Sequence, residues 1–312
     1  MEAISFTIVI VTYNRIDCLK KALECYENQD LKPACVLVVN NASTDSTYEY
    51  LSEWKSEITS FEKIVINNSV NLGGAGGFAT GVKAAIELSN DFIFVADDDA
   101  YPDRYMLKML SDGYQKINDN RDVASICTSV VNYGKYDYVH RRKIRKGLLS
   151  IKKIFSNDSD YQKDFFQINE FSFVGAAFKT DIAKEAGIPR EDFFIYFDDT
   201  EYSHRIEQYG RIICIPTSVM NHNVASGHDD NLVTWRSYYS LRNSLIVLKK
   251  YYPLRYFCFE AAKNYIVRTT MVARIIKKRT KSEIRLLRDA IRDAYHNSTG
   301  ISEKYRPGAK LK

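Results

Sequence analysis

The first hundred residues repeat one pattern four times: a short apolar run, a polar turn, and then a stretch with helical spacing. The apolar runs are Phe6–Val11, Cys35–Val39, Lys63–Ile66 and Phe92–Ala96. Such runs are typical of strands buried on both faces of a parallel sheet, with the helical stretches as crossovers. The sequence therefore predicts an α/β fold with a mostly parallel, doubly wound central sheet and helices over Ile16–Glu27, Thr47–Trp54 and Phe78–Leu88.

A cluster of polar or glycine residues follows each of these predicted strands. The four clusters are Thr12–Arg15, Asn40–Asp45, Asn71–Gly77 and Asp97–Asp99. Because open α/β sheets bind ligands outside the carboxyl ends of their strands, the clusters are expected to converge on one ligand site.

Asp97, Asp98 and Asp99 come directly after the fourth run. Three adjacent carboxylates repel one another, and a divalent cation that also binds substrate phosphates relieves the repulsion. His222, after the predicted strand Ile212–Ile215, is a candidate third ligand. The alternatives are a solvated acidic turn and a structural histidine.

Four glycines in Asn71–Phe78, namely Gly73, Gly74, Gly76 and Gly77, predict a loop whose backbone approaches a ligand ahead of a helix. The spacing is neither G-x-G-x-x-G nor a P-loop, which disfavours a dinucleotide site or an NTPase. A purely structural turn is the alternative.

Asp198 and Asp199 follow a predicted aromatic strand, Phe193–Phe197. A carboxylate at a strand end beside a bound cation is a candidate general base. Since an aspartate before Thr-Glu-Tyr-Ser also caps helices well, a structural cap is the alternative reading.

Charge divides the chain unequally. Residues 1–240 carry 34 Asp and Glu against 26 Lys and Arg, whereas residues 241–312 carry five against 18. We therefore expect a catalytic domain over 1–240, with halves of about 1–110 and 111–240, and a basic helical extension over 241–312. Its amphipathic stretch Tyr256–Ile276 predicts an anionic partner.

Three smaller expectations complete the organisation of the chain. Phe171–Phe178 should be a further strand, and the basic stretch Arg141–Lys146 should be a flexible insertion. The six cysteines form no C-x-x-C pair, so reduced, buried thiols are expected. No leader or spanning helix is apparent, so we expect a chain that is neither secreted nor membrane-spanning.

Taken in order, the motifs resemble family 2 of the glycosyltransferases, which has the GT-A fold. The resemblance covers Phe6 to about Asn243 and rests on the polar clusters above, on Phe197-Asp-Asp-Thr-Glu201, on His222 and on Tyr238–Asn243. Asn71–Phe78 is similar to the galactofuranosyltransferases, with rhamnosyltransferases as near relatives. The family's usual base-contacting aspartate is Asn40 here, whose amide can still pair with uracil or thymine.

The resemblance implies an inverting transfer from a pyrimidine-nucleotide sugar, with UDP-galactofuranose first and dTDP-rhamnose second. It implies Mn²⁺ or Mg²⁺ held by Asp97, Asp99 and His222, and Asp199 as base supported by Asp198. The expected donor-binding residues are Thr12, Asn14, Arg15, Asn40, Asp45, Asn71, Gly73, Gly74, Gly76, Gly77, Asp97 and Asp98.

The implied acceptor is a glycan or a lipid-linked glycan in cell-surface polysaccharide assembly. The enzyme would be cytoplasmic and peripheral on the inner membrane face, with its basic helices on anionic lipid. Those helices could instead pack on the catalytic domain or on a second subunit in a homo-oligomer. No nucleic-acid partner is expected, because the body is acidic and carries no base-reading motif.

Two rivals come from other classes. A sugar-1-phosphate nucleotidyltransferase also combines a glycine-rich loop with a metal-binding aspartate, but its loop usually follows the first strand. Here Thr-Tyr-Asn-Arg follows the first strand, and the glycines come after the third. An inactive sugar-binding module is the other rival, which the intact set of carboxylates disfavours.

Overall fold

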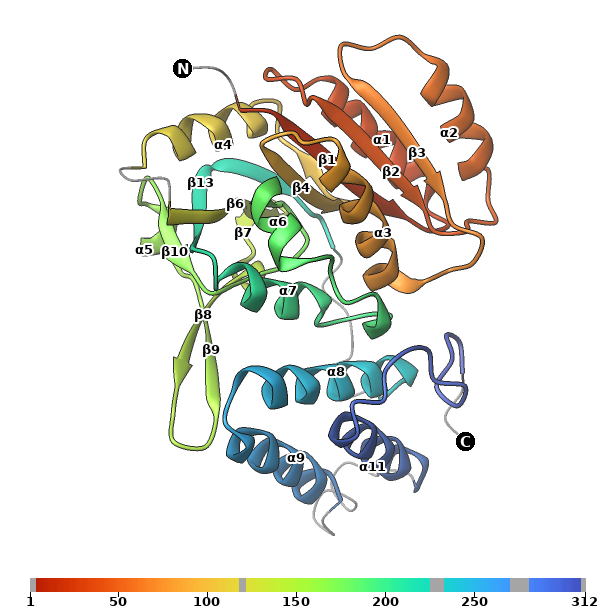
Figure 1. Cartoon of the computed structure of the whole chain (residues 1–312), viewed down its shortest axis with the longest axis vertical. Coiled ribbons are helices and arrows are strands. Elements are labelled where there is room, and N and C mark those ends of the chain that lie inside the picture. Colours follow the sequence, from red (N-terminus) through yellow and green to blue (C-terminus); the bar gives the residue numbers. More distant parts are fainter. Residues whose placement is uncertain (1–3, 118–121, 225–232, 270–280, 310–312) are drawn as a thin grey trace.

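The protein is described from a computed structural model that covers residues 4–117, 122–224, 233–269 and 281–309. A twisted sheet forms its centre (Figure 1). The strand order is β10-β13-β6-β12-β4-β1-β2-β3. These strands are β1 (Phe6–Thr12), β2 (Cys35–Asn40), β3 (Glu62–Asn67), β4 (Phe92–Asp97), β6 (Val123–Asn132), β10 (Phe166–Ile168), β12 (Ala176–Lys179) and β13 (Arg211–Asn221).

The four strands predicted first are all present and parallel, in the order β4-β1-β2-β3. β12 lies antiparallel between β4 and β6, β13 runs parallel to β6, and β10 is antiparallel at the edge. Two short strands, β5 (Tyr101–Pro102) and β7 (Lys135–Tyr136), pair with β13 and β6. The predicted α/β fold with a mostly parallel central sheet is confirmed.

Helices cover both faces of the sheet. Apolar residues of α1 (Ile16–Glu27), α2 (Thr47–Ser56) and α4 (Met106–Gln115) pack in one core on the first face. Those of α3 (Gly73–Glu87), α6 (Thr180–Ala186) and α7 (Asp198–Ile206) pack in a second core on the other face. A one-turn helix, α5 (Asp158–Tyr161), lies before β10. The sheet is therefore buried on both sides, which explains its apolar strands.

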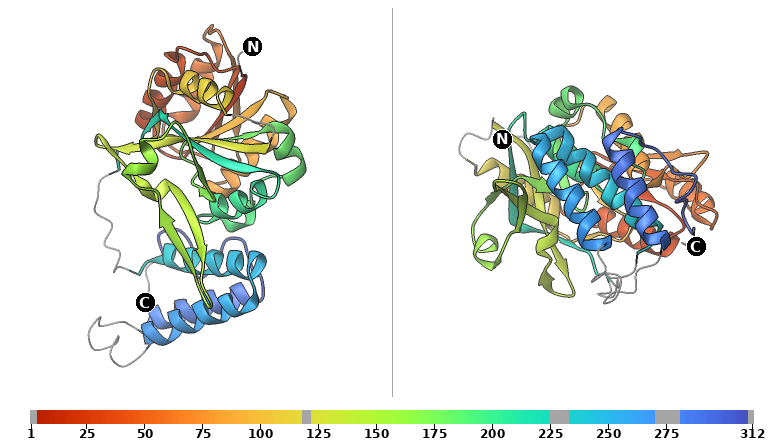
Figure 2. Two further views of the ribbon diagram at one scale, coloured as in Figure 1. Left: turned by 90° about the vertical axis from the view of Figure 1, so that its left-hand side faces the viewer. Right: turned by 90° about the horizontal axis from the view of Figure 1, so that it is seen from below.

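A third core joins the C-terminal helices α8 (Trp235–Tyr251), α9 (Leu254–Thr269) and α11 (Lys281–Tyr295). Phe193 and Phe194 from the catalytic part enter the same core. Figure 2 shows the three helices as a layer beside the sheet domain. The predicted division of the chain at residue 240 falls inside α8 and stays a prediction.

The third core corrects one expectation about the extension. Tyr256 and Phe257, expected in the amphipathic stretch that contacts an anionic partner, are buried in it, whereas Phe259, Tyr265 and Ile266 are exposed. The rest of that stretch, residues 270–276, lies outside the described residues. In the described part of the chain, no helix is both long and apolar enough to cross a bilayer.

The basic stretch Arg141–Lys146 was expected to be a flexible insertion, and this is wrong. It is β8, which pairs with β9 (Ile151–Phe155) and with β11 (Glu170–Phe171) in a second sheet. The guanidinium of Arg141 is fully buried and donates to four main-chain carbonyls, those of Thr128, His140, Val174 and Gly175. These bonds fix the base of the hairpin to the main sheet.

Three further local expectations are corrected. Phe193–Phe197 is not a strand but a short 3₁₀ turn, Glu191–Phe193, followed by residues with positive φ. The glycines of Gly73–Gly77 lie in the first turns of α3 rather than in a loop before it. Phe171–Phe178 divides between β11 and β12. The six cysteines are free, as expected, but Cys258 is exposed and Cys18 and Cys25 are only partly buried.

Candidate active site at the carboxyl edge of the sheet

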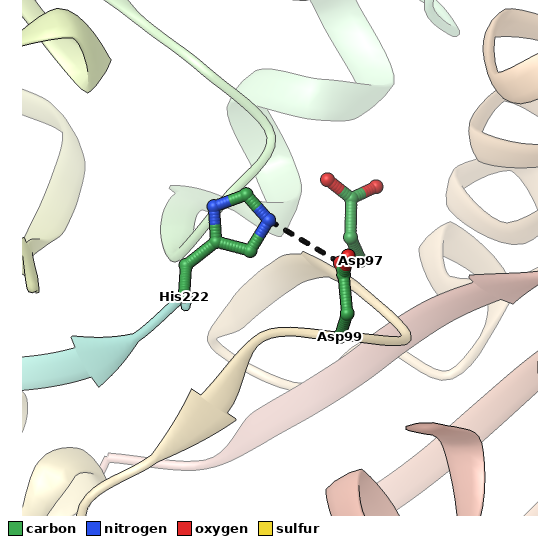
Figure 3. A group of neighbouring side chains, drawn as sticks. All are labelled: Asp97, Asp99 and His222. Atoms are coloured by element: carbon green, nitrogen blue, oxygen red, sulfur yellow. Dashed lines mark ion pairs between the residues drawn. The ribbon is translucent and has the colours of Figure 1, made fainter. Parts of the chain in front are cut away.

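The turn after β4 brings Asp97 and Asp99 together with His222 from the end of β13. One ligand atom from each of the three lies within 4.8 Å of the others. Figure 3 shows His222 turned toward the two carboxylates, with its Nε2 3.3 Å from Asp99 Oδ1. The sheet order places the ends of β4 and β13 at the same edge, and residues 125 positions apart meet there.

Arg15, from the turn after β1, forms ion pairs with the rest of the acidic turn, and Thr12, at the end of β1, donates a hydrogen bond to it. Arg15 contacts Asp98 Oδ1 at 3.0 Å and Asp99 Oδ2 at 2.7 Å, and the Thr12 hydroxyl donates to Asp98 Oδ2 at 2.7 Å. Asp97 forms no ion pair with any residue in the described ranges. Of the three carboxylates, it is the one that lacks an ion pair with any residue that the structure describes.

The pKa values follow this distribution of charge. Burial, together with the negative charge of Asp99, raises the pKa of Asp97 to about 7. Burial also raises the pKa of Asp98 to about 6, against the hydrogen bonds from Thr12 and Arg15. Burial acts in the same direction on Asp99, but the hydrogen bond from His222 and the charge of Arg15 hold its pKa below the ordinary value. The turn thus needs one more positive charge near Asp97.

This donor set fits a divalent cation. Two carboxylate oxygens and one imidazole nitrogen leave further positions for phosphate oxygens and water, as expected of Mn²⁺ or Mg²⁺ bound with a nucleotide. The alternative reading of a solvated acidic turn does not describe this site, because Asp98 is buried and the other two carboxylates are partly buried.

A cavity of about 600 Å³ opens beside the acidic turn. The predicted donor-binding residues that line it are Thr12, Arg15, Asn71, Gly73, Gly74, Asp97 and Asp98. Asn14, Asn40, Asp45, Gly76 and Gly77 are not among its lining residues. Their assignment to donor binding stays a prediction, because no ligand contact tests it.

The residues that do not line the cavity make contacts within the turns and helices near it. The Asn40 amide donates to Asn67 Oδ1, and Asn14 Oδ1 accepts from the main chain of Thr44. Asp45 accepts from the backbone of Ile16 and Thr47, at the starts of α1 and α2. A Cβ on Gly77 would meet Val11 of β1 at 2.4 Å, so this glycine lets α3 approach the sheet.

Several lining residues were not predicted from the sequence. They come from Asn41, from the loop Phe194–Tyr196, from Trp235 and Arg236 at the start of α8, and from Pro307 near the C-terminus. The C-terminal part of the chain therefore closes the cavity. Asn41 could have been suggested by its place in the polar cluster after β2, but no local signal marks Trp235 or Pro307.

Asp198 and Asp199 begin α7, directly after the loop that lines the cavity. Phe197, with a φ of 67°, occupies the capping position, so neither aspartate is the cap residue itself. Burial and the charge of Asp199 raise the pKa of Asp198 well above its ordinary value. Asp199 is more accessible, with 23% of its side chain exposed, and Arg142 Nη2 lies 3.9 Å from its Oδ2.

The loop between Phe193 and Asp198 is held by α8. The Asn243 amide nitrogen lies within 3.0 Å of the carbonyls of Phe193, Ile195 and Tyr196, and it is completely buried. Phe194, Tyr196 and Phe197 all have φ near +66°, a conformation that L-residues adopt at a cost of about 1–3 kcal/mol each. Asn243 offsets part of that cost and fixes the loop beside the cavity.

Comparison with known proteins shows which family and which individual proteins the chain resembles. The family model "Glycosyl transferase family 2" matches residues 7–187. The galactofuranosyltransferase GlfT1 of Mycolicibacterium smegmatis is 28% identical over 206 residues, which cover 65% of this chain and 65% of that protein. The chain thus spans just under two thirds of the length of that relative.

Two further likenesses are more distant. A dolichyl N-acetyl-α-D-glucosaminyl phosphate 3-β-D-2,3-diacetamido-2,3-dideoxy-β-D-glucuronosyltransferase of Methanococcus voltae is 26% identical over 223 residues, 70% of this chain and 67% of that protein. The crystal structure of GalNAc-T7 with UDP, GalNAc and Mn²⁺ superposes with a TM-score of 0.60 at 13% identity. It covers 95% of this chain and 57% of that chain. The GT-A fold is confirmed.

The contacts of Asn243 predict a measurable contribution to stability. Asn243→Ala should lower the free energy of unfolding by about 1–3 kcal/mol, because it leaves buried carbonyls without a donor. Urea unfolding of the full chain measures the change. Ser244→Ala is the matched control: its hydroxyl donates to the Leu241 carbonyl in the same helix, and the variant should stay within about 0.5 kcal/mol of wild type. Equal stability of the two variants would contradict the role given to Asn243.

Proposed function

The chain belongs to glycosyltransferase family 2, and from this premise we propose that it is a metal-dependent, inverting hexosyltransferase using a pyrimidine-nucleotide sugar. UDP-galactofuranose is the first candidate donor and dTDP-rhamnose the second. The acceptor is a hydroxyl of a glycan or lipid-linked glycan in cell-surface polysaccharide assembly. The likeness to GlfT1 supports galactofuranose, and the cavity beside Asp97 and Gly74 supports a nucleotide sugar.

The cation site is assigned to Asp97, Asp99 and His222. A bound Mn²⁺ or Mg²⁺ would stabilise the negative charge of the departing nucleoside diphosphate. The imidazole ligand favours Mn²⁺, because Mg²⁺ prefers oxygen ligands. Arg15 remains paired with Asp98 and Asp99 and so keeps the acidic turn in place while the donor binds.

The donor lies in the cavity in this proposal, with its nucleoside against the turns after β1 and β2 and its diphosphate near Gly74. Gly74 is exposed at the start of α3, and a Cβ there would meet no heavy atom within 4 Å. Nothing in the fold requires glycine at this position. A ligand that approaches the backbone closely would require it.

Asp199 is assigned as the general base. A base must reach the acceptor hydroxyl, and the Asp199 side chain is partly exposed whereas that of Asp198 is buried. Asp199 would take the proton as the hydroxyl oxygen attacks the anomeric carbon from the side opposite the leaving diphosphate. The attack inverts that carbon and needs no covalent intermediate. Asp198, close to Asp97 and Asp199, supports the base.

The proposed location is the cytoplasmic face of the membrane, where a lipid-linked acceptor would be presented. Lys281, Arg285 and Arg288 of α11 are exposed, as are Phe259, Tyr265 and Ile266 of α9. Basic and apolar groups together favour an anionic bilayer surface. A homo-oligomer through the same helices is the alternative partner.

The proposed activity itself can be tested by incubating the protein with UDP- and dTDP-sugars in the presence of Mn²⁺ and following slow donor hydrolysis. Asp99→Asn should abolish transfer while the fold remains intact, and chelator-treated wild type should regain activity with Mn²⁺ or Mg²⁺. Circular dichroism checks the fold. Full activity in excess chelator would remove the metal assignment together with that of His222.

A second prediction follows from the placement of the donor diphosphate near Gly74. Gly74→Ala should leave the unfolding transition unchanged but weaken UDP binding at least about tenfold, equivalent to about 1.4 kcal/mol. Calorimetric titration with UDP and Mn²⁺ measures it. Gly81→Ala is the contrasting variant in the same helix: its Cβ would meet Val9 at 2.3 Å, so stability should fall instead. Wild-type UDP affinity in Gly74→Ala would show that the donor lies elsewhere.

A third prediction follows from the assignment of Asp199 as the general base. Asp199→Asn should lower kcat by about 10²–10⁴-fold with donor affinity nearly unchanged, because the proton acceptor is lost and the cavity is not altered. Steady-state kinetics with a saturating acceptor measures it. If Asp198→Asn were the more damaged variant, the roles of the two carboxylates would have to be exchanged.

A further inference from the structure

The β8–β9 hairpin ends in an exposed apolar tip. Between the two strands lie Gly147–Ser150, and within this turn Leu148 is 82% exposed and Leu149 is 43% exposed. Both ribbon views show the hairpin extending from the sheet domain along the helical layer (Figures 1 and 2). Leu148 therefore buries little of its apolar surface in the fold of the isolated chain, and Leu149 leaves almost half of its surface in water.

Two basic side chains face each other just behind that tip. Arg145 of β8 and Lys152 of β9 are directly opposite in the strand register, and both are exposed. Like charges opposite each other destabilise a strand pair. Within the parts of the chain that the structure describes, neither forms an ion pair. Lys143 and Lys153 on the same strands do, with Asp160 and Glu170. The hairpin therefore carries an uncompensated positive charge that an anionic partner would neutralise.

The tip is held in place rather than left free. The Tyr256 hydroxyl donates to the Gly147 carbonyl at 2.6 Å, and Arg255 donates to the Leu148 carbonyl at 3.0 Å. Both donors belong to the first turn of α9. This helix begins at Leu254, which is 56% exposed. The tip and the start of α9 thus form one rigid surface with apolar groups and basic groups side by side.

We propose that the hairpin tip inserts into the headgroup layer of an anionic lipid bilayer, with Leu148 and Leu149 in the apolar boundary and Arg145 and Lys152 at the lipid phosphates. The inference rests on the proposed function at a membrane surface but assigns the contact to a segment outside the C-terminal helices. Charge complementarity identifies the partner as an anionic bilayer. Two leucines offer far less than the roughly 800 Å² that a stable protein interface buries per partner.

The same hairpin leads from the tip to the proposed base. At its other end, Arg142 of β8 donates to the Thr200 hydroxyl at 3.2 Å and lies 3.9 Å from Asp199. Leu148 lies six positions beyond Arg142, along the rest of β8 and through Gly147 of the turn, so the two residues are at most about 20 Å apart. Insertion of the tip would therefore hold Asp199 within about that distance of the lipid, which suits an acceptor hydroxyl on a short lipid-linked glycan.

The test compares binding of the full chain to vesicles of equimolar phosphatidylcholine and phosphatidylglycerol. The double variant Leu148→Ser, Leu149→Ser should bind at least tenfold more weakly than wild type. Ile58→Ser, which replaces a fully exposed isoleucine between α2 and β3, should bind like wild type. Arg145→Gln and Lys152→Gln should each weaken binding about fivefold and lessen its dependence on salt.

A second measurement reports insertion directly. The fluorescence of Leu148→Trp should be quenched by brominated phosphatidylcholine in the same vesicles, and that of Ile58→Trp should not. Wild-type binding by the leucine double variant, an unquenched Leu148→Trp, or no binding of wild type to anionic vesicles would each overturn the proposal. So would a change of oligomeric state in the hairpin variants, since it would indicate a second copy as the partner.

The outcome is separable from that of the proposed enzymatic function. The hairpin variants should hydrolyse the donor in solution at the wild-type rate, because no hairpin residue that they replace lines the donor cavity. Asp99→Asn should lose hydrolysis but bind vesicles like wild type. A wild-type protein that binds anionic vesicles but hydrolyses no donor would contradict the proposed function alone, and one that hydrolyses the donor but does not bind the vesicles would contradict the hairpin proposal alone.

Discussion

The site depends on one electrostatic constraint: three consecutive carboxylates are held at the end of a buried strand. Asp97, Asp98 and Asp99 cannot move apart, because β4 lies between β1 and β12 and fixes the turn. Their repulsion is reduced by Arg15 from the turn after β1 and by His222 from β13. The negative charge that is not paired lies mainly on Asp97, beside the cavity. The acidic turn is thus contacted by side chains from the ends of two other strands, β1 and β13, and leaves a place for one more cation.

The geometry of the site also depends on the C-terminal helices, because one of them holds the loop before α7. Its residues Phe194 and Tyr196, both with positive φ, line the cavity, and the loop leads into α7, where Asp198 lies close enough to Asp97 for their charges to interact. Within the loop the Ile195 amide donates to the Phe193 carbonyl. Asn243 and Arg242 of α8, 47 to 50 residues away, supply further donors to the carbonyls of Phe193, Ile195 and Tyr196. The helical layer is therefore part of the site, and its packing on Phe193 and Phe194 is a condition for the geometry of the proposed base.

How much of this could be predicted from the sequence differs from element to element. The first four strands were predictable because each is a short apolar run closed by polar residues, and the same pattern located Asp97–Asp99 and Thr12–Arg15. Phe193–Phe197 looked like a strand because aromatic residues favour strands, but the conformation is decided by Asn243, which is distant in sequence. Arg141–Lys146 looked solvated because it is basic, yet Arg141 is buried and donates to a carbonyl of β6, that of Thr128, and to Val174 in the loop between β11 and β12. Trp235 and Pro307 line the cavity only through tertiary packing, for which no local pattern exists.

The distribution of charge also orients the molecule. An acidic part of the chain, with a net charge of −8 over residues 1–240, is repelled by an anionic surface, whereas residues 241–312 carry +13 and are attracted to it. The β8–β9 hairpin is the exception within the acidic part, because it places Arg145 and Lys152 on the same side as α9. Repulsion at one end and attraction at the other favour a single orientation, in which the hairpin and α9 face the lipid. In that proposed orientation Asp199 lies beside Arg142, at the end of the hairpin opposite the lipid-facing tip, so the charges that would bring the enzyme to the surface would also set the height at which its acceptor is met.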